Sequence, residues 1–141
     1  HAQLLSNMDK FKLVGICDED IKLEHNLNEF GVPFYNNVEK LISITKPDAV
    51  IIATPNETHL KVLQICTTYK VDILIEKPIS DSIESSNKII ELSNSPDFNI
   101  LIGHHRRYNN LIQKLRSIIV SGEIANLVAV SVIWGIMKPK N

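Results

Sequence analysis

Short apolar, β-branched segments alternate along this chain with longer amphipathic segments, and this alternation constrains the fold more than any other feature. The clearest apolar segment is Asp48-Ala49-Val50-Ile51-Ile52-Ala53. An unbroken apolar run predicts a strand that is buried on both faces, as in a parallel sheet covered by helices. Further strands are expected over residues 12–18, 32–35, 71–75 and 99–103.

The amphipathic segments between these strands predict helices. Leu60, Leu63 and Cys66, for example, recur on one stripe with helical spacing. Helices are expected over residues 20–30, 38–45, 58–69, 82–93 and 111–120. The candidate end residues are Asn36 or Asn37 and Ser80 or Asp81 as N-terminal caps, with Gly31 and Gly122 as C-terminal stops. Strands that alternate with helices in this way favour a doubly wound α/β sheet.

Charge and cysteine content narrow the range of partners. The 15 Lys and Arg residues nearly balance the 16 Asp and Glu residues, so nucleic acid and anionic membranes are unfavourable partners. No apolar run approaches the roughly 20 residues that cross a bilayer. Cys17 and Cys66 lie far apart in apolar segments, which is typical of free thiols in a reducing cytoplasm. We therefore expect a cytoplasmic protein with neither a membrane nor a nucleic-acid partner.

Polar clusters directly follow four of the expected strands. They are Asp18, Thr54-Pro55-Asn56, Glu76-Lys77-Pro78 and His104-His105-Arg106-Arg107. In open parallel sheets, ligands bind at the carboxyl ends of the strands. A shared binding site explains four such clusters better than coincidence does.

The first two clusters each allow two interpretations. Asp18 could accept hydrogen bonds from the adenosine ribose of NAD and repel the 2′-phosphate of NADP, or it could cap the next helix. Pro55 stiffens its loop, which could pack against a dinucleotide or could be a plain turn capped by Asn56 or Thr58. His59, in the first turn of the next helix, is by itself more typical of a structural histidine than of a ligand.

The last two clusters carry the polar side chains suited to chemistry. A lysine such as Lys77, placed after a buried strand and partly desolvated, could exchange a proton with a substrate hydroxyl. The alternative is a Glu-Lys surface pair beside a turn. Neighbouring histidines on an extended backbone point to opposite faces, so we expect no metal at His104 and His105. Arg106 and Arg107 could bind a phosphate or could form a solvated helix start.

In this order the clusters resemble the glucose-fructose oxidoreductase / inositol dehydrogenase / MocA family. The resemblance covers essentially the whole chain, and its Glu-Lys-Pro turn is the most specific motif. The matching segments are 15–18, 48–55 with His59, 76–78, 103–109, 122–124, Trp134 and Lys138-Pro139. The resemblance implies a Rossmann-type sheet that lacks its first strand and Gly-rich loop. His1 is interpreted as the histidine that follows that loop, and not as a functional terminus.

The resemblance also implies a division of the chain and a role for each cluster. Residues 1–122 would form a partial NAD(P)-binding domain, and residues 123–141 would begin a C-terminal α+β domain for substrate binding and oligomerisation, with a strand over 125–134. The residues expected to line the dinucleotide are Thr54, Pro55, Asn56 and His59. Asp18 would hold the adenosine ribose and favour NAD over NADP.

At the reaction centre, the resemblance places Glu76 near the nicotinamide ribose and makes Lys77 the catalytic lysine. The bond between Lys77 and Pro78 is often cis in such proteins. His105 and Arg106 would face the substrate, a sugar, cyclitol or related polyol. The family's catalytic Asp and His would follow residue 141.

The expected activity is hydride transfer between NAD and a secondary alcohol. The full-length protein would be a homo-oligomer, and the 141-residue piece alone would be inactive. Two alternatives remain open, since one fold can host several functions: a non-catalytic nucleotide-binding regulator and an inactive remnant.

Overall fold

The computed structural model describes residues 1–133, and it divides the chain into two compact units, residues 1–104 and residues 105–141. The division into units follows the last strand of the first unit. The domain boundary expected after residue 122 lies within the second unit and stays a prediction.

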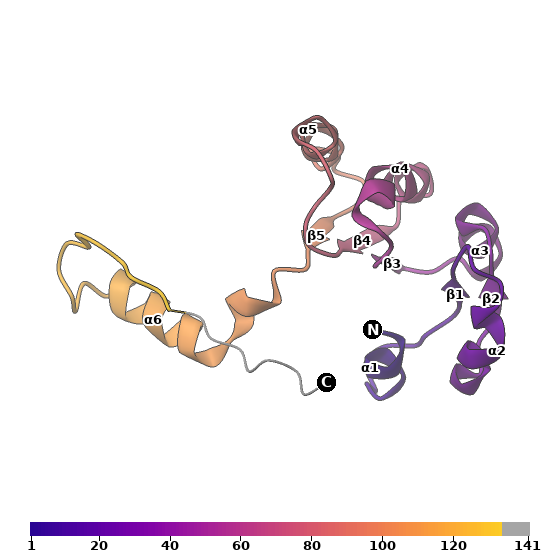
Figure 1. The fold of residues 1–141 in the computed structure, drawn as a ribbon, viewed down its shortest axis with the longest axis horizontal. Coiled ribbons are helices and arrows are strands. Elements are labelled where there is room, and N and C mark those ends of the chain that lie inside the picture. The colour runs from indigo at the N-terminus through magenta and orange to yellow at the C-terminus, as the bar shows by residue number, and fades with distance from the viewer. Residues whose placement is uncertain (134–141) are drawn as a thin grey trace. The chain divides into compact units, whose positions relative to one another are not determined.

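The first unit contains five short parallel strands in two sheets (Figure 1). Strands β1 (Ile16–Cys17) and β2 (Phe34–Tyr35) form one pair. Strands β3 (Ala49–Ile52), β4 (Asp72–Ile75) and β5 (Ile100–Ile102) form the other sheet in that order. In the Rossmann strand order 3-2-1-4-5-6, the first strand separates the second from the fourth. A break between β1 and β3 is therefore what the predicted lack of that first strand produces.

Helices connect the strands, as the alternating sequence predicts. In the first unit they are α1 (Ala2–Ser6), α2 (Leu23–Leu27), α3 (Val38–Thr45), α4 (His59–Thr68) and α5 (Ile83–Leu92), with 3-10 turns η1 (Asn28–Phe30) and η2 (Asn56–Thr58). Helices α3, α4 and α5 contact one another in sequence order, and α4 packs on β3 and β4. The fold is a Rossmann-type α/β fold with parallel sheets.

The helix ends follow local hydrogen-bonding rules. The Asn37 side chain accepts a hydrogen bond from the Lys40 amide at 2.8 Å and caps α3, which confirms one of the two predicted candidates. The prediction that Ser80 or Asp81 caps α5 is wrong, because Ser82 is the cap. The buried Ser80 hydroxyl instead donates to the Ser82 carbonyl oxygen.

The core lies between the sheets and the α3–α5 layer. Its buried residues are Leu41, Ile42, Ile52, Leu63, Cys66, Val71, Ile73, Ile75 and Ile89. Burial of the sheet on both faces, as the apolar runs predicted, is not observed. Ile73 and Ile75 are buried against the helices, whereas Leu74 on the other face is half-buried and Leu101 is 54% exposed. Side chains alternate between the faces of a strand, so one face lacks a complete cover among the described residues.

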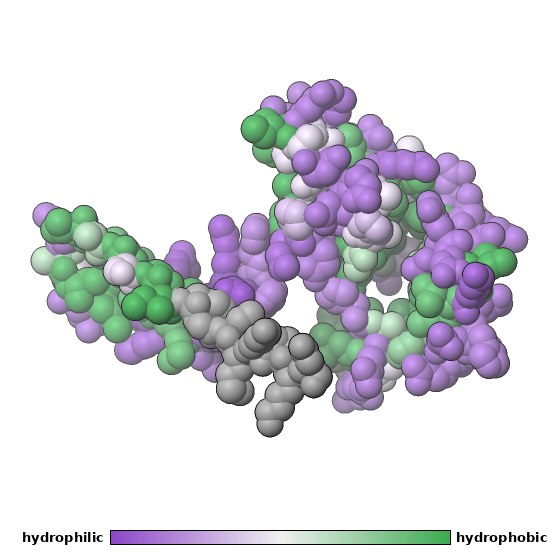
Figure 2. Space-filling model, viewed as in Figure 1, coloured by the Kyte–Doolittle hydropathy of each residue, from purple (hydrophilic) through white to green (hydrophobic). Residues whose placement is uncertain are grey.

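The second unit contains the 3-10 turn η3 (His105–Tyr108) and helix α6 (Asn110–Val120), which the Asn109 side chain caps. Gly122 follows α6 with a φ of +78°, a conformation that glycine adopts without strain. Figure 2 shows apolar side chains exposed on this unit. Among residues 1–133, no helix is both long and apolar enough to span a membrane.

The strand expected over residues 125–134 is not formed in residues 125–133, and Trp134, Lys138 and Pro139 lie outside the described residues. A strand needs a neighbour to pair its backbone groups, and the described part of the chain offers this segment none. Val128 and Ile133 are accordingly more than nine-tenths exposed.

Candidate functional site

The carboxyl edge of the β3-β4-β5 sheet brings three predicted segments together. Ile52 pairs with Ile75, and Ile75 pairs with Ile102, so the three strands end level. The backbone pairing continues one residue further, because the Glu76 amide donates to the Ile52 carbonyl and the Gly103 amide donates to the Ile75 carbonyl. Residues 53–56, 76–79 and 103–104 therefore leave the sheet at the edge where parallel sheets bind ligands.

The Glu76 carboxylate is fixed at this edge by three neighbours. Its Oε1 lies 2.8 Å from the Nε2 of His1, and its Oε2 accepts a hydrogen bond from the Lys77 amide at 3.1 Å. A Cβ atom on Gly103 would lie 3.1 Å from Oε2, so the absence of a side chain there makes room for the carboxylate. The Glu76 side chain remains 29% exposed, which leaves it open to a ligand.

The contact between His1 and Glu76 is a feature that the sequence interpretation missed. Seventy-five positions separate the two residues, and no local pattern connects them. The available signal was the family register, which made His1 the histidine after the phosphate loop. That loop and the Glu-Lys-Pro turn both belong to the same edge of a Rossmann sheet.

The bond between Lys77 and Pro78 is cis, as the resemblance implied. Glu76 pairs with His1, and no ion pair joins it to Lys77 among residues 1–133, which argues against a simple Glu-Lys surface pair. The Lys77 side chain is exposed in the structure of residues 1–133. Desolvation of its ammonium group would therefore have to come with a bound ligand.

The loop after β3 is tied to itself and to helix α4. The Thr58 hydroxyl lies 2.7 Å from both the Pro55 carbonyl oxygen and the Thr54 hydroxyl. The side chain of Thr58 does not cap α4, and Asn56 begins the 3-10 turn η2 without capping it. The simple capped turn that the sequence left open is thus not what is observed.

His59 has no exposed surface. Its Nε2 lies 2.9 Å from the Thr54 carbonyl oxygen, and its Nδ1 lies 3.2 Å from the Ile79 carbonyl oxygen. The resemblance implies that His59 contacts the dinucleotide directly, but no atom of its side chain is accessible to a ligand.

Asp18 directly follows β1 and is exposed. Its amide donates to the Tyr35 carbonyl, and its Oδ1 accepts a hydrogen bond from the Asp20 amide at 2.9 Å. Helix α2 begins only at Leu23, with Lys22 before it, so the interpretation of Asp18 as a helix cap is wrong. An exposed carboxylate at the carboxyl end of a strand is what ribose recognition requires.

His105 and Arg106 lie in η3 of the second unit, and both are exposed. The prediction of an extended backbone at His104-His105 is wrong for His105, which already belongs to the 3-10 turn. Among residues 1–133, no group of three or more His, Cys, Asp or Glu side chains is arranged to hold a metal ion.

Neither cysteine is activated as a nucleophile. Burial raises the pKa of the Cys66 thiol to about 11. Burial, together with the charges of Asp18 and Glu19, also raises the pKa of Cys17. Both thiols are free, as the sequence predicted.

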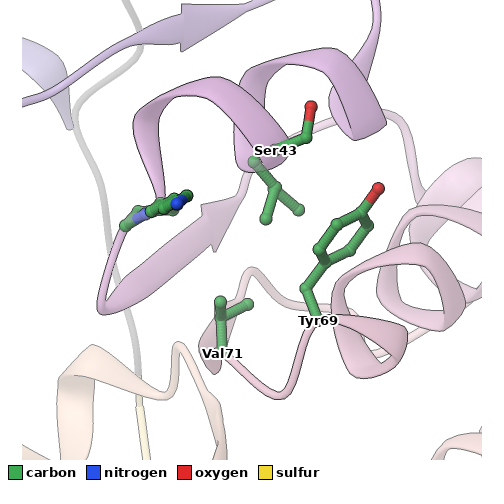
Figure 3. A pocket seen from close by; sticks show the side chains of 6 residues that line it. Ser43, Tyr69 and Val71 are labelled. Carbon is green, nitrogen blue, oxygen red and sulfur yellow. The ribbon is translucent and has the colours of Figure 1, made fainter.

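A shallow pocket of about 310 Å³ lies elsewhere (Figure 3). Ser43, Tyr69 and Val71 are among the residues that line it, together with the Lys46-Pro47 segment that precedes β3. Tyr69 and Val71 precede β4, so the pocket lies at the amino ends of the strands. It is therefore separate from the candidate site, and none of the predicted site residues lines it.

Comparison with known proteins identifies the family. Residues 1–104 match a family model described as an oxidoreductase family with an NAD-binding Rossmann fold, named for Gfo, Idh and MocA. The chain belongs to this family. The match spans the whole first unit. It therefore includes His1, Glu76 and Gly103, which meet at the candidate site.

Individual relatives agree with this assignment. The chain is 34% identical over 102 residues to an inositol 2-dehydrogenase of Corynebacterium glutamicum (strain R), covering 72% of this chain and 30% of the relative. It is 26% identical over 142 residues to the rhizopine catabolism protein MocA of Rhizobium meliloti, covering 100% of this chain and 45% of that protein. The solved structure of a myo-inositol 2-dehydrogenase from Lactobacillus plantarum superposes with a TM-score of 0.81 at 26% identity, covering 91% of this chain and 39% of that one. The chain thus spans less than half the length of each of these relatives.

Proposed function

We propose that the whole protein carrying this chain is an NAD-dependent dehydrogenase that transfers a hydride between nicotinamide and a secondary alcohol of a sugar, cyclitol or related polyol. The observation that carries the proposal is the Glu76-Lys77-Pro78 turn, which leaves the sheet beside the Thr54-Pro55-Asn56 loop and Gly103. Family membership and relatives named inositol 2-dehydrogenase support it.

The residues at the sheet edges fit a dinucleotide. Asp18 offers an exposed carboxylate after β1, and Glu76 offers a partly exposed carboxylate after β4. Asp18 would accept hydrogen bonds from the ribose hydroxyls and repel a 2′-phosphate, which favours NAD over NADP. Glu76 would orient the nicotinamide ribose, and residues 54–56 would pack along the dinucleotide. NAD would supply the hydride acceptor.

Lys77 would hold and move the proton of the substrate hydroxyl at its Nζ atom, as a general base in the direction of oxidation. Its exposure in residues 1–133 is compatible with this role, because substrate and cofactor would exclude water from it on binding. His105 and Arg106 would contact the substrate.

The remaining features of the proposal concern the whole protein. Residues 1–122 would belong to the NAD-binding domain, and residues 123–141 would begin the domain that binds substrate and forms a homo-oligomer. A cytoplasmic location is supported by the two free cysteines.

Calorimetry on the whole protein tests the proposal, with NAD and NADP titrated into the wild type, Asp18→Ala and Lys77→Ala. We expect NAD to bind more tightly than NADP, Asp18→Ala to erode this preference, and Lys77→Ala to bind NAD but lose turnover in a screen of polyols. A folded wild type that binds neither nucleotide would refute the proposal. NAD binding without turnover on any polyol would favour a non-catalytic regulator.

A further inference from the structure

One imidazole ring contacts both loops of the candidate site. His59 is the first residue of α4, and its Nε2 faces the Thr54 carbonyl oxygen, in the loop after β3. Its Nδ1 faces the carbonyl oxygen of Ile79, which directly follows the cis Lys77-Pro78 unit after β4. Twenty positions separate His59 from Ile79, so the ring is a bridge between segments that are distant in the sequence.

His59 occupies a position that otherwise belongs to the apolar core. Residues 59, 63 and 66 share one face of α4, and His59, Leu63 and Cys66 all have no exposed surface. A polar ring is unfavourable at such a position unless its nitrogens find partners. Both nitrogens of His59 face main-chain oxygens, so the ring makes directed contacts that an apolar side chain of the same size could not make.

The two loops are already stiff individually, but this stiffness does not fix one relative to the other. Pro55 restricts the first loop, and the Thr58 hydroxyl closes it on itself. Pro78 restricts the second loop. Apart from the pairing of the strands that they follow, the two loops are joined in residues 1–133 through the His59 ring, which contacts a main-chain oxygen of each.

We propose that His59 is a positioning residue for the dinucleotide site, which holds the Thr54 and Ile79 carbonyls so that residues 54–56 and 76–79 present a single, fixed surface. This inference rests on the proposed function. It replaces direct contact between His59 and the dinucleotide with an indirect role. Both partners are carbonyl oxygens, which only accept, and a neutral imidazole carries one N–H group. The ring therefore donates from Nε2 to Thr54 in one tautomer and from Nδ1 to Ile79 in the other.

Three variants of His59 and one control separate this role from core filling. His59→Leu removes both contacts, whereas a glutamine amide reaches about as far as Nε2 and an asparagine amide about as far as Nδ1. Cys66→Ala is the matched control, because Cys66 is equally buried on the same helix face, two turns further along. The whole protein is used throughout. The readouts are the Kd for NAD and the hydrogen exchange of peptides covering residues 54–58 and 76–80.

We expect His59→Leu to weaken NAD binding roughly tenfold, the effect of about one hydrogen bond. Exchange should accelerate in both peptides, at the amides of Thr58, Glu76 and Lys77. His59→Gln should restore protection mainly in residues 54–58, and His59→Asn mainly in residues 76–80. Cys66→Ala should lower thermal stability while leaving NAD binding and both peptides as in the wild type.

The inference is overturned if folded His59→Leu matches Cys66→Ala in NAD affinity and in the exchange of both peptides. If His59→Leu does not fold, His59→Gln and His59→Asn are compared with Cys66→Ala instead. The inference is then overturned if residues 76–80 exchange as in the wild type in His59→Gln and residues 54–58 do so in His59→Asn. Should the wild type bind no NAD, the proposed function fails. The exchange data then still decide whether His59 joins the two loops.

Discussion

Replacing Gly103 with alanine tests whether the position of the Glu76 carboxylate matters for binding. An added Cβ would lie 3.1 Å from Oε2 and 3.3 Å from Cδ of Glu76, which is closer than an ordinary van der Waals contact. Among residues 1–133 the glycines with positive φ are Gly31 and Gly122, so Gly103 has a backbone conformation that alanine fits. The collision with Glu76 is therefore the main structural consequence of the change.

The expected effect on stability is small because two contributions oppose each other. The carboxylate must retreat by a few tenths of an ångström, which stretches its 3.1 Å hydrogen bond from the Lys77 amide. Such a bond contributes about 1.5–3 kcal/mol when buried, but less here because Glu76 is partly exposed and water can replace the donor. Alanine in turn stabilises by about 0.4–1 kcal/mol through the unfolded state. The free energy of unfolding should change by no more than about 1 kcal/mol.

NAD affinity should respond more strongly, because a displaced carboxylate would no longer meet the nicotinamide ribose that the proposed function assigns to it. We expect the Kd for NAD to rise roughly tenfold in the whole protein, the cost of about one hydrogen bond. Gly15→Ala is the control, since its Cβ would lie 3.4 Å or more from every neighbour. Urea denaturation and calorimetry measure the two quantities. The reasoning is refuted if Gly103→Ala folds and binds NAD as tightly as the wild type and Gly15→Ala.

Three further perturbations have expected outcomes. Asp18→Asn keeps the shape of the side chain but removes its charge, so the ratio of the NADP to the NAD dissociation constants should fall roughly tenfold in parallel titrations. Asn37→Ala should lower the free energy of unfolding by about 1 kcal/mol through the lost cap of α3, whereas Asn36→Ala should change it little in the same denaturation series. Burial raises the pKa of Cys66 from 9.0 to about 11, so the folded state keeps a proton that the unfolded state releases. The resulting stabilisation is complete below about pH 9 and is lost as the pH rises toward about 11, and Cys66→Ala should lose less stability over that range.

The sequence predicted most of the strands and helices of the first unit and the edge where the candidate clusters gather, because both depend on local patterns. Helix α1 was not predicted. Apolar runs mark the strands. The carboxyl ends of parallel strands lie at one edge of the sheet whatever the register, so this edge can be predicted before the register is known. Strand lengths were less predictable. Residues 12–18 yielded only Ile16–Cys17, because a strand extends only as far as its neighbour, and β2 is equally short.

Contacts between distant segments could not be predicted from local patterns. The Glu76 carboxylate meets His1 and Gly103, and the His59 ring meets Ile79, only because the sheet fixes where each segment ends. Similarly, residues 125–133 are rich in the β-branched residues that favour a strand but lack a pairing partner in the described chain. Local preference supplies the candidate, and pairing decides the outcome.

The break between the two sheets makes helix α3 important for the site. Asp18 follows β1, whereas Glu76 follows β4, and within residues 1–133 no strand pairing joins these two sheets. Helix α3 contacts β1, β2 and α4, and its buried Leu41 and Ile42 belong to the same core as the residues of β3 and β4. In a continuous Rossmann sheet the first strand would carry this connection through hydrogen bonds. Within residues 1–104, the packing of one apolar helix face connects the carboxylate proposed for the adenosine ribose to the one proposed for the nicotinamide ribose.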